Sequence, residues 1–479
     1  MKIGILSVNM HTKVLNFASP LHSMVFQNFL KDNGIDSTII DYKPCYFGKF
    51  DVRHPLFSVI DKPDSNPYKQ ERLLKKWRVL FYEREKRFDR FDEFIKEHYK
   101  TTDKCYNQNL MDKPDCDLDF DCYICVTDII WKRNRITGFD RGFWLASKCM
   151  DGKKKIAYTP SRGATKYKLP DKKQILPWLA DFDYISVREN SLKEELDNLT
   201  GLDIPVLCDP VFFMDKEFYT SLARKPENAP EKPYVLTYIV MEENPRLLQK
   251  AGLFAKEKGL DLIELNEDYE KRELPEEVNH RMIYDIGVEE WLWYILNAEY
   301  IFTNSFHEIV LAIIMQKQFF VGKRAGDKID NLLSIFNLED RRVADDDMDT
   351  SLGMEDIDFA PVEEKRKEFS AEGKKFILDA IHDLEGREHR PIMSDEQLSE
   401  KLAIIEDQLK EDEDYRAEKE KAKGLTPDGR PLPQNREEAI EEWNRIKRQP
   451  KVLKLRLKRK IRNVFDDKDP EPEYIKKHL

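Results

Sequence analysis

The sequence predicts an α/β protein with two doubly wound, mainly parallel sheets that face each other across a cleft, followed by a charged helical extension. Short apolar runs of strand length alternate with apolar residues at helical spacing. This alternation occurs in two blocks, which a charged segment containing prolines separates. From about residue 363 onward the pattern is helical and strongly charged.

The first block opens as a strand–helix–strand unit. Residues 3–8 form an apolar run, and apolar side chains recur at helical spacing over 21–29. Gly34 follows this helix as a C-terminal cap, and residues 35–42 supply the next strand. Ser191 and Glu194 match a capping box, and Gly201 ends that helix. In the rest of the block we expect strands at 156–158, 184–187 and 202–207, and helices at 175–179 and from about 191.

The second block repeats the alternation after a segment rich in charge and proline. We place the first domain at 1–216, the linker at 217–232, the second domain at 233–388 and a charged helical tail at 389–479. In the second domain we expect strands at 234–240, 260–265, 299–303 and 319–322, and helices at 246–258, 288–297, 308–315 and 328–336.

Composition excludes several classes of protein. The chain has 479 residues and a formal net charge of -11, which argues against a protein devoted to nucleic acid. Its start reads as a strand, and its longest aliphatic run, residues 309–315, is too short to cross a bilayer. All seven cysteines precede Pro210 and form no regular framework, as in a reducing cytoplasm. Cys122 and Cys125 share an apolar strand-like stretch, so we expect no metal site.

The loop after the first strand excludes the common nucleotide-binding motifs. Residues 9–20 contain no glycine, so neither a Gly-x-Gly-x-x-Gly fingerprint nor a phosphate-binding P-loop is present there. Nicotinamide, flavin and ATP-hydrolysis functions therefore lose their usual support.

The stretch Thr303-Asn304-Ser305-Phe306-His307 combines a strand end with a helix start. Ser305 and Glu308 match a capping box, so we expect Ser305 at the N-cap and His307 in the first helical turn. Backbone N–H groups and the helix dipole favour an anion at such a place. A histidine there can donate to a phosphate or transfer a proton near neutral pH. The alternative is a capping serine beside a surface histidine.

Two further polar side chains follow predicted strands. Arg188 can bind a carboxylate or phosphate bidentately, through two guanidinium N–H groups. Alternatively, it can form a salt bridge with Glu189. Asp128 can hold a sugar hydroxyl, with Trp131 as a stacking platform. A turn aspartate and a core tryptophan are the alternatives for this second pair.

Taken in order, these motifs resemble the polysaccharide pyruvyl transferase family over roughly residues 1–385. The match is strongest in Thr303-Asn304-Ser305-Phe306-His307, which follows the helical stretch 289–298. Ser186-Val187-Arg188-Glu189 is similar to the family's Ser-x-Arg-Glu motif, and Thr127-Asp128-Ile129-Ile130-Trp131 to its Ser-Asp-Gln-x-Trp segment. The remaining segments that carry the resemblance are 2–6, 16–21, 207–210, 328–333 and 338–341.

The resemblance implies a fold with two Rossmann-like domains, like that of the GT-B glycosyltransferases. It also implies an enzyme that transfers a pyruvyl group from phosphoenolpyruvate to two sugar hydroxyls and leaves a cyclic ketal. Phosphoenolpyruvate is then a substrate, and no cofactor or metal is expected. The roles that follow are His307 and Arg188 in catalysis, Arg188, Asn304, Ser305, His307 and Lys328 in donor binding, and Asn16, Asp128 and Trp131 in acceptor binding.

One departure from the family lies beside the histidine. Glu308 and Ile309 stand where the family commonly has Gly-Thr. We expect Glu308 to place negative charge at the donor site, so that Glu308→Gly would tighten phosphoenolpyruvate binding.

The tail carries a second signal. Residues 451–465 combine seven Lys and Arg with an apolar stripe, and a loop at 424–433 precedes them. Such a helix suits an anionic membrane surface, where a lipid-linked acceptor is found, or packs on the acidic helix at 406–420. We therefore expect a cytoplasmic protein, free or held at the inner membrane face, with a sugar or lipid-linked oligosaccharide as acceptor. A glycosyltransferase using a nucleotide-sugar donor and a non-catalytic relative remain as alternatives.

Overall fold

A computed structural model describes residues 1–240, 244–266, 272–274, 276–344 and 355–423. The predicted loop at 424–433 and the basic helix at 451–465 lie outside the described residues. Contacts divide the described residues into one unit of Met1–Tyr167 with Gln174–Leu398, and a second of Lys168–Lys173 with residues 399–423. In the second unit, Lys173 Nζ and Glu406 Oε1 form an ion pair at 2.8 Å.

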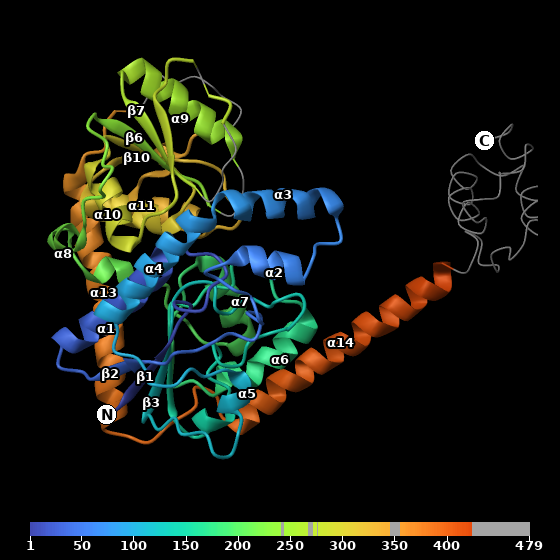
Figure 1. Cartoon of the computed structure of the whole chain (residues 1–479). Helices are drawn as coiled ribbons and strands as arrows, with labels where there is room; N and C mark the ends of the chain where they lie inside the picture. The colour runs from blue at the N-terminus through green and yellow to red at the C-terminus, as the bar shows by residue number, and fades with distance from the viewer. Residues whose placement is uncertain (241–243, 267–271, 275, 345–354, 424–479) are drawn as a thin grey trace, which may run out of the picture. The chain divides into compact units, whose positions relative to one another are not determined.

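The larger unit contains two parallel sheets of five strands each, so the predicted fold class is confirmed. The first has the order β2-β1-β3-β4-β5, and in its centre Ile5 pairs with both Ile39 and Ile124. Figure 1 shows β1 and β2 of this sheet in blue and β3 in teal, and β6 and β7 of the second sheet in yellow-green. The first-sheet strands are β1 (Ile3–Leu6), β2 (Ser37–Ile39), β3 (Cys122–Val126), β4 (Lys154–Tyr158) and β5 (Tyr184–Ile185).

The second sheet has the order β10-β9-β6-β7-β8. Its strands are β6 (Tyr234–Tyr238), β7 (Asp261–Leu265), β8 (His280–Ile283), β9 (Tyr300–Thr303) and β10 (Gln318–Val321). The edge strand β8 was not predicted, because its sequence His280-Arg281-Met282-Ile283 begins with two charged or polar residues and all four are only half-buried.

The predicted helices of both blocks are present. They are α1 (Ala18–Asp32), α6 (Leu169–Ala180), α7 (Asn190–Thr200), α9 (Pro245–Lys258), α10 (Val288–Asn297), α11 (Phe306–Met315) and α12 (Lys328–Phe336). The charged helices after residue 358 are α13 (Phe359–Glu385) and α14 (Asp395–Lys423). Helices without a sequence prediction are α2 (Pro55–Asp61), α3 (Pro67–Val79), α4 (Phe81–His98), α5 (Gln108–Met111) and α8 (Lys216–Leu222), the last of them at the start of the predicted linker.

Two local predictions need correction, and a third is confirmed. Helix α7 begins at Asn190, and Ser191 Oγ donates to Asp327 Oδ1 at 3.0 Å instead of capping the helix. The strand predicted at 202–207 is reduced to a single bridge between Val187 and Val206. Gly201 does end α7 in the left-handed conformation, as predicted, with a φ of 79°.

Buried contacts join the elements of the two sheets within the larger unit. Phe17 stacks on Trp291 with ring centroids 5.3 Å apart, and Arg87 Nη1 donates to the carbonyl of Tyr284 at 2.9 Å. Helix α13 contacts α11 and α12 as well as β4. Gly373 permits this close packing, since a Cβ there would lie 2.5 Å from Tyr158 Oη. These contacts keep the carboxyl ends of both sheets in a defined arrangement.

No helix in the part of the chain that the structure describes has the length and apolar composition needed to cross a bilayer.

Candidate active site

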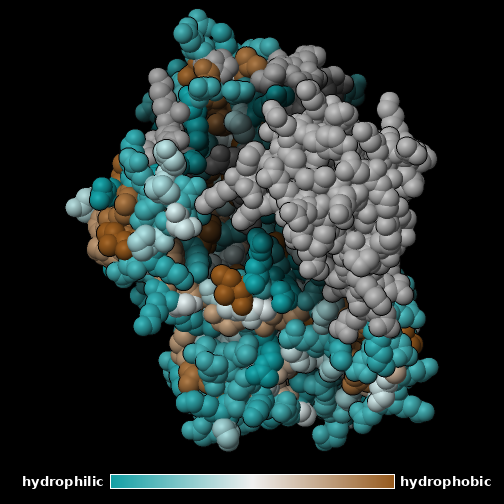
Figure 2. Space-filling view, turned by 90° about the vertical axis from the view of Figure 1, so that its right-hand side faces the viewer, coloured by the Kyte–Doolittle hydropathy of each residue, from teal (hydrophilic) through white to brown (hydrophobic). Residues whose placement is uncertain are grey.

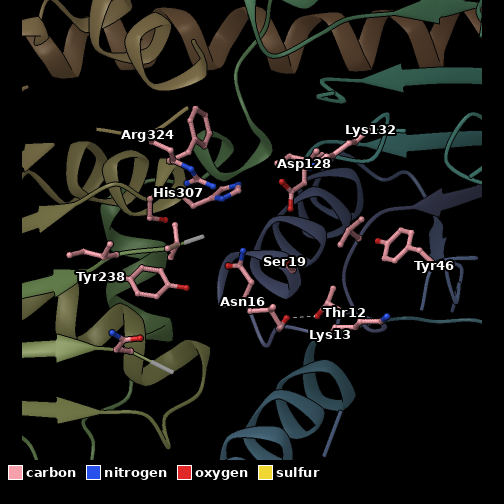
Figure 3. Close-up of a pocket in the computed structure, with 18 of the residues that line it drawn as sticks. Thr12, Lys13, Asn16, Ser19, Tyr46, Asp128, Lys132, Tyr238, His307 and Arg324 are labelled. Atoms are coloured by element: carbon pink, nitrogen blue, oxygen red, sulfur yellow. Dashed lines mark hydrogen bonds between the residues drawn. The ribbon is translucent and has the colours of Figure 1, made fainter. Parts of the chain in front are cut away.

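A cavity of about 1060 Å³ lies at the carboxyl ends of strands from both sheets. Residues that follow β1, β3, β6, β7, β9 and β10 line it. Figure 3 shows His307 and Arg324 on one side of this cavity, and Asp128 and Lys132 on the other. In Figure 2 the face shown is hollowed, and mostly hydrophilic residues surround the hollow.

Positive charge is concentrated in this cavity. Eleven of the lining residues are Lys or Arg, whereas three are Asp or Glu. The chain as a whole has a formal net charge of -11, so the cavity has the opposite sign to the rest of the molecule. Charges of one sign around a concave site attract ligands of the other sign. The cavity is therefore suited to an anionic ligand.

His307 lies in the first turn of α11 and lines the cavity. Ser305 is the N-cap residue, as predicted. His307 Nε2 lies 3.3 Å from Oδ2 of Asp209, a fully buried carboxylate just before Pro210. A histidine that faces a cavity with a carboxylate behind it has the geometry of a proton-transfer group.

Asp209 is the centre of a buried network. Its Oδ2 accepts hydrogen bonds from Thr127 Oγ1 at 2.7 Å and from Arg188 Nη1 at 2.9 Å. Burial alone raises the pKa of Asp209, but His307 and Arg188 together hold that pKa well below its ordinary range. The carboxylate therefore stays ionised behind His307.

Asp128 lies in the left-handed backbone region directly after β3, with a φ of 59°. This conformation costs energy in a non-glycine residue and is typical of functional sites. Arg188 Nη2 is 3.7 Å from Asp128 Oδ1. Although burial raises the pKa of Asp128, the charges of Arg188 and His307 lower it to about 2. Asp128 thus offers an ionised acceptor to the cavity, which it lines.

Lys328 and Arg324 extend the positive wall beside His307. The Lys328 ammonium lies 5.6 Å from the centre of the Phe306 ring, and Arg324 Nη1 donates to the carbonyl of Asn304 at 3.0 Å. Burial, followed by the charges of Arg188 and Arg324, lowers the pKa of Lys328 to about 7. An amine with this pKa gains or loses its charge near neutral pH.

The sequence profile of the polysaccharide pyruvyl transferase family matches residues 21–321. The chain belongs to this family. The matched region contains β3, β9 and the start of α11, and with them Asp128, Asp209 and His307. The family is one of transferases, so the cavity belongs to an enzyme of that class, as the sequence analysis expected.

Comparisons with curated sequences and with solved structures add no assignment beyond the family. No curated protein matches the chain in sequence. Among solved structures, the UDP-GlcNAc 2-epimerase from Neisseria meningitidis, bound to UDP-GlcNAc, is 9% identical with a TM-score of 0.42, covering 80% of this chain and 100% of its own. The UDP-GlcNAc 2-epimerase from Methanocaldococcus jannaschii is 12% identical with a TM-score of 0.38, over 80% and 100%. Similarity at this level supports no conclusion about ligands.

Asn16, Asp128, Ser305, His307 and Lys328 line one cavity, so five predicted site residues come together. The other three are not among its lining residues.

Arg188 lies behind the residues that line the cavity. It is bound to Asp209, and its guanidinium group lies 4.6 Å from the Phe306 ring centre. Asn304 is fully buried, and its Oδ1 accepts from the Val240 N–H at 2.7 Å. Both side chains therefore shape the site from behind.

Trp131 is a core tryptophan, which was the alternative to a stacking platform for a sugar. Its side chain is fully buried and stacks on Trp144 with ring centroids 4.3 Å apart and an interplanar angle of 7°. Its Nε1 donates to the carbonyl of Phe143 at 3.0 Å. With its polar atom satisfied and one face covered in the interior, Trp131 is not available to stack on a sugar.

From the sequence, Glu308 is expected to form a capping box and to face the anion site, and this expectation needs correction. Glu308 is fully buried and accepts a hydrogen bond from Thr303 Oγ1 at 3.1 Å instead of forming the predicted capping box. Burial raises the pKa of Glu308 well above its ordinary value, because the charged form of a carboxyl is disfavoured away from water. It is not among the residues that line the cavity.

Sequence reasoning missed Asp209, Arg324 and His22 as parts of the site. The ring centroids of His22 and His307 lie 5.8 Å apart. Burial lowers the pKa of His22 to about 4. His22 Nδ1 lies 3.2 Å from Ser23 Oγ. The Asp-Pro turn at Asp209 was visible in the sequence, but its partner His307 is 98 residues away.

Proposed function

We propose that this transferase moves a pyruvyl group from phosphoenolpyruvate to two hydroxyls of one sugar in a surface polysaccharide or its lipid-linked precursor. The products are a cyclic ketal and inorganic phosphate. The observation that carries the proposal is the concentration of eleven Lys and Arg residues around a cavity that also contains His307 and Asp128. A donor with a carboxylate and a phosphate requires such a positive wall.

In this proposal the donor binds on the side of the cavity formed by residues that follow β9 and β10 of the second sheet. Lys328 and Arg324 supply charge there, and the first turn of α11 directs backbone N–H groups toward the same region. Ser305, the N-cap residue at this helix start, also lines the cavity. Arg188 contributes indirectly, because it holds Asp209 and Asp128 in their ionised forms.

The reaction needs one proton delivered and two removed. Protonation of the donor methylene carbon creates an oxocarbenium-like centre, which the first sugar hydroxyl attacks. The second hydroxyl displaces phosphate, and the ketal forms. Of the two hydroxyl protons, one replaces the proton delivered to carbon and the other leaves with phosphate. His307, backed by Asp209, is the proton-transfer group in this scheme, and Asp128 orients a sugar hydroxyl from the opposite wall.

Donor affinity is expected to fall as pH rises from about 6 to 9. The lowered pKa of Lys328, about 7, means that this amine is charged below that pH and neutral above it. An anionic donor binds the charged form better, so binding takes up a proton near pH 7 and weakens above it. Calorimetry with phosphoenolpyruvate in buffers of different ionisation enthalpy measures this uptake. Lys328→Arg should flatten the pH profile, and an unchanged profile in this variant would exclude Lys328 as its source.

The proposed donor can be tested without the acceptor. Thermal unfolding is expected to shift upward with phosphoenolpyruvate, by an amount that follows RT ln(1 + [L]/Kd). Sulfate at equal ionic strength controls for nonspecific anion binding. Stabilisation by nucleotide sugars and not by phosphoenolpyruvate would support a glycosyltransferase instead. A shift with neither donor would point to a non-catalytic relative.

A further inference from the structure

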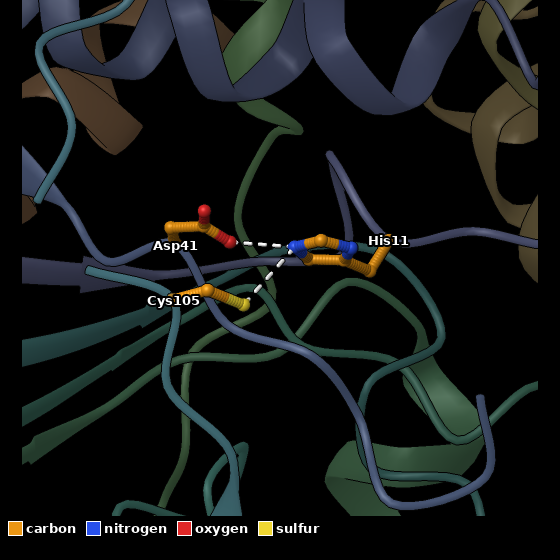
Figure 4. A group of neighbouring side chains, drawn as sticks. All are labelled: His11, Asp41 and Cys105. Atoms are coloured by element: carbon orange, nitrogen blue, oxygen red, sulfur yellow. Dashed lines mark hydrogen bonds and ion pairs between the residues drawn. The ribbon is translucent and has the colours of Figure 1, made fainter. Parts of the chain in front are cut away.

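Three side chains outside the cavity wall converge on one point in the first domain. His11 Nε2 lies 2.6 Å from Asp41 Oδ1 and 3.5 Å from Cys105 Sγ. In Figure 4 both dashed lines end on the same ring nitrogen. His11 and Asp41 are half-buried and Cys105 is exposed, so solvent reaches the group.

This arrangement differs from a nucleophilic Cys–His–Asp triad. In a triad, the nucleophile and the carboxylate occupy opposite nitrogens of the imidazole. Here the carboxylate and the thiol both approach Nε2, and a single N–H donates fully to only one of them. A cation at the centre satisfies all three atoms at once, because imidazole nitrogen, carboxylate oxygen and thiolate sulfur each donate electron pairs to it.

The three donors are held by structure that does not depend on a bound ion. Parallel bridges join Ile39 to Thr101 and Tyr42 to Tyr106, on both sides of Asp41 and Cys105. The Asp41 N–H donates to Thr102 Oγ1 at 3.0 Å. The His11 ring meets the edge of Phe47 at a centroid distance of 5.7 Å and an angle of 79°. Preorganised donors of this kind are what a metal site requires.

We propose that His11, Asp41 and Cys105 bind one zinc ion, with water in the fourth position. Nitrogen, sulfur and oxygen donors together suit zinc, whereas magnesium and calcium prefer oxygen alone.

One other group of potential ligands was found among the described residues, formed by Glu97, His98 and Glu289. There Arg224 already pairs with Glu289 Oε2 at 2.9 Å, so an internal cation neutralises the carboxylate. We expect zinc to favour the His11 group.

The proposed ion has a structural consequence for the active site. His11 immediately precedes Thr12, Lys13 and Val14, which line the cavity. Asp41 lies 30 residues from His11 in sequence and follows β2. Zinc would therefore tie the loop after β1 to the edge of the first sheet and restrain one side of the cavity. This role is independent of which donor the enzyme uses.

The test is metal binding to the full chain, freed of metal with a chelator under reducing conditions. Zinc titration against a chromophoric competitor is expected to give one tight site per chain. Cobalt substitution should give a near-ultraviolet thiolate-to-cobalt charge-transfer band and the intense visible bands of four-coordinate cobalt. Cys105→Ser is expected to lose the charge-transfer band and His11→Gln the stoichiometric zinc binding. The control His98→Gln, in the competing group, should retain both.

Two results would overturn the proposal. The first is wild-type protein that binds no zinc in competition, and the second is a charge-transfer band that survives in Cys105→Ser. Circular dichroism checks that the variants are folded. If Cys105→Ser does not fold, loss of zinc binding in folded His11→Gln supports the site, and retained binding there refutes it.

Discussion

Pyruvyl transfer is expected to slow by about 10²–10⁴-fold when His307 is replaced by asparagine. The reason is the place of this side chain, which faces the cavity while its Nε2 lies 3.3 Å from the ionised Asp209. Asparagine keeps a polar amide of similar reach but cannot exchange a proton near neutral pH. The measurement is transfer of isotope-labelled pyruvyl from phosphoenolpyruvate to polysaccharide from the source cells, at saturating donor.

The chain offers a matched control one residue further along the same helix. Glu308→Gln alters a buried side chain that does not line the cavity, so activity within a few-fold of the wild type is expected. Donor affinity of both variants, measured by calorimetry, separates lost chemistry from lost binding. Activity of His307→Asn close to that of Glu308→Gln would refute the proton-transfer role.

Replacement of Asp209 by asparagine is expected to destabilise the fold by about 3–5 kcal/mol, because it leaves a buried cation without its closest partner. Arg188 is buried, and its Nη1 lies 2.9 Å from Asp209 Oδ2. Asp128 and Glu189 remain as countercharges, and Asp128, at 3.7 Å, is too distant to replace that hydrogen bond. Chemical denaturation, read as the change in the free energy of unfolding, measures the loss.

A second variant shows whether the unpaired charge is the cause. Arg188→Met combined with Asp209→Asn removes both members of the pair, so part of the lost stability should return. A double variant less stable than the sum of both single changes predicts would contradict this explanation. So would a loss below about 1 kcal/mol in Asp209→Asn, the range of an exposed ion pair.

Local patterns made much of the fold predictable. The strand at β1 follows from a short apolar run, and the helix at α1 from apolar residues at a spacing of about 3.6. The N-cap at Ser305 and the helix end at Gly201 depend on neighbouring residues alone, and both were predicted. Helix α4 was not, because its buried face includes Arg84 and Arg87, which are satisfied by partners outside the helix.

The same distinction explains which candidate residues lie at the cavity and which do not. Strand ends placed Asp128 and His307 correctly at the cavity, because the carboxyl ends of parallel strands share one edge of a sheet. The direction of a side chain at such an end depends on packing against distant segments. Glu308 turns to Thr303, and Trp131 turns to Trp144 in the core.

The sequence by itself therefore determined the fold class, the family and the position of the Thr303–His307 helix start, since each depends on periodicity or on neighbours in the chain. Only the tertiary structure decided what surrounds that helix start. Asp209 behind His307, the concentration of positive charge around the cavity, and the burial of Glu308 all arise from contacts between residues remote in sequence. Charge and burial are properties of a three-dimensional environment, and no local pattern encodes them.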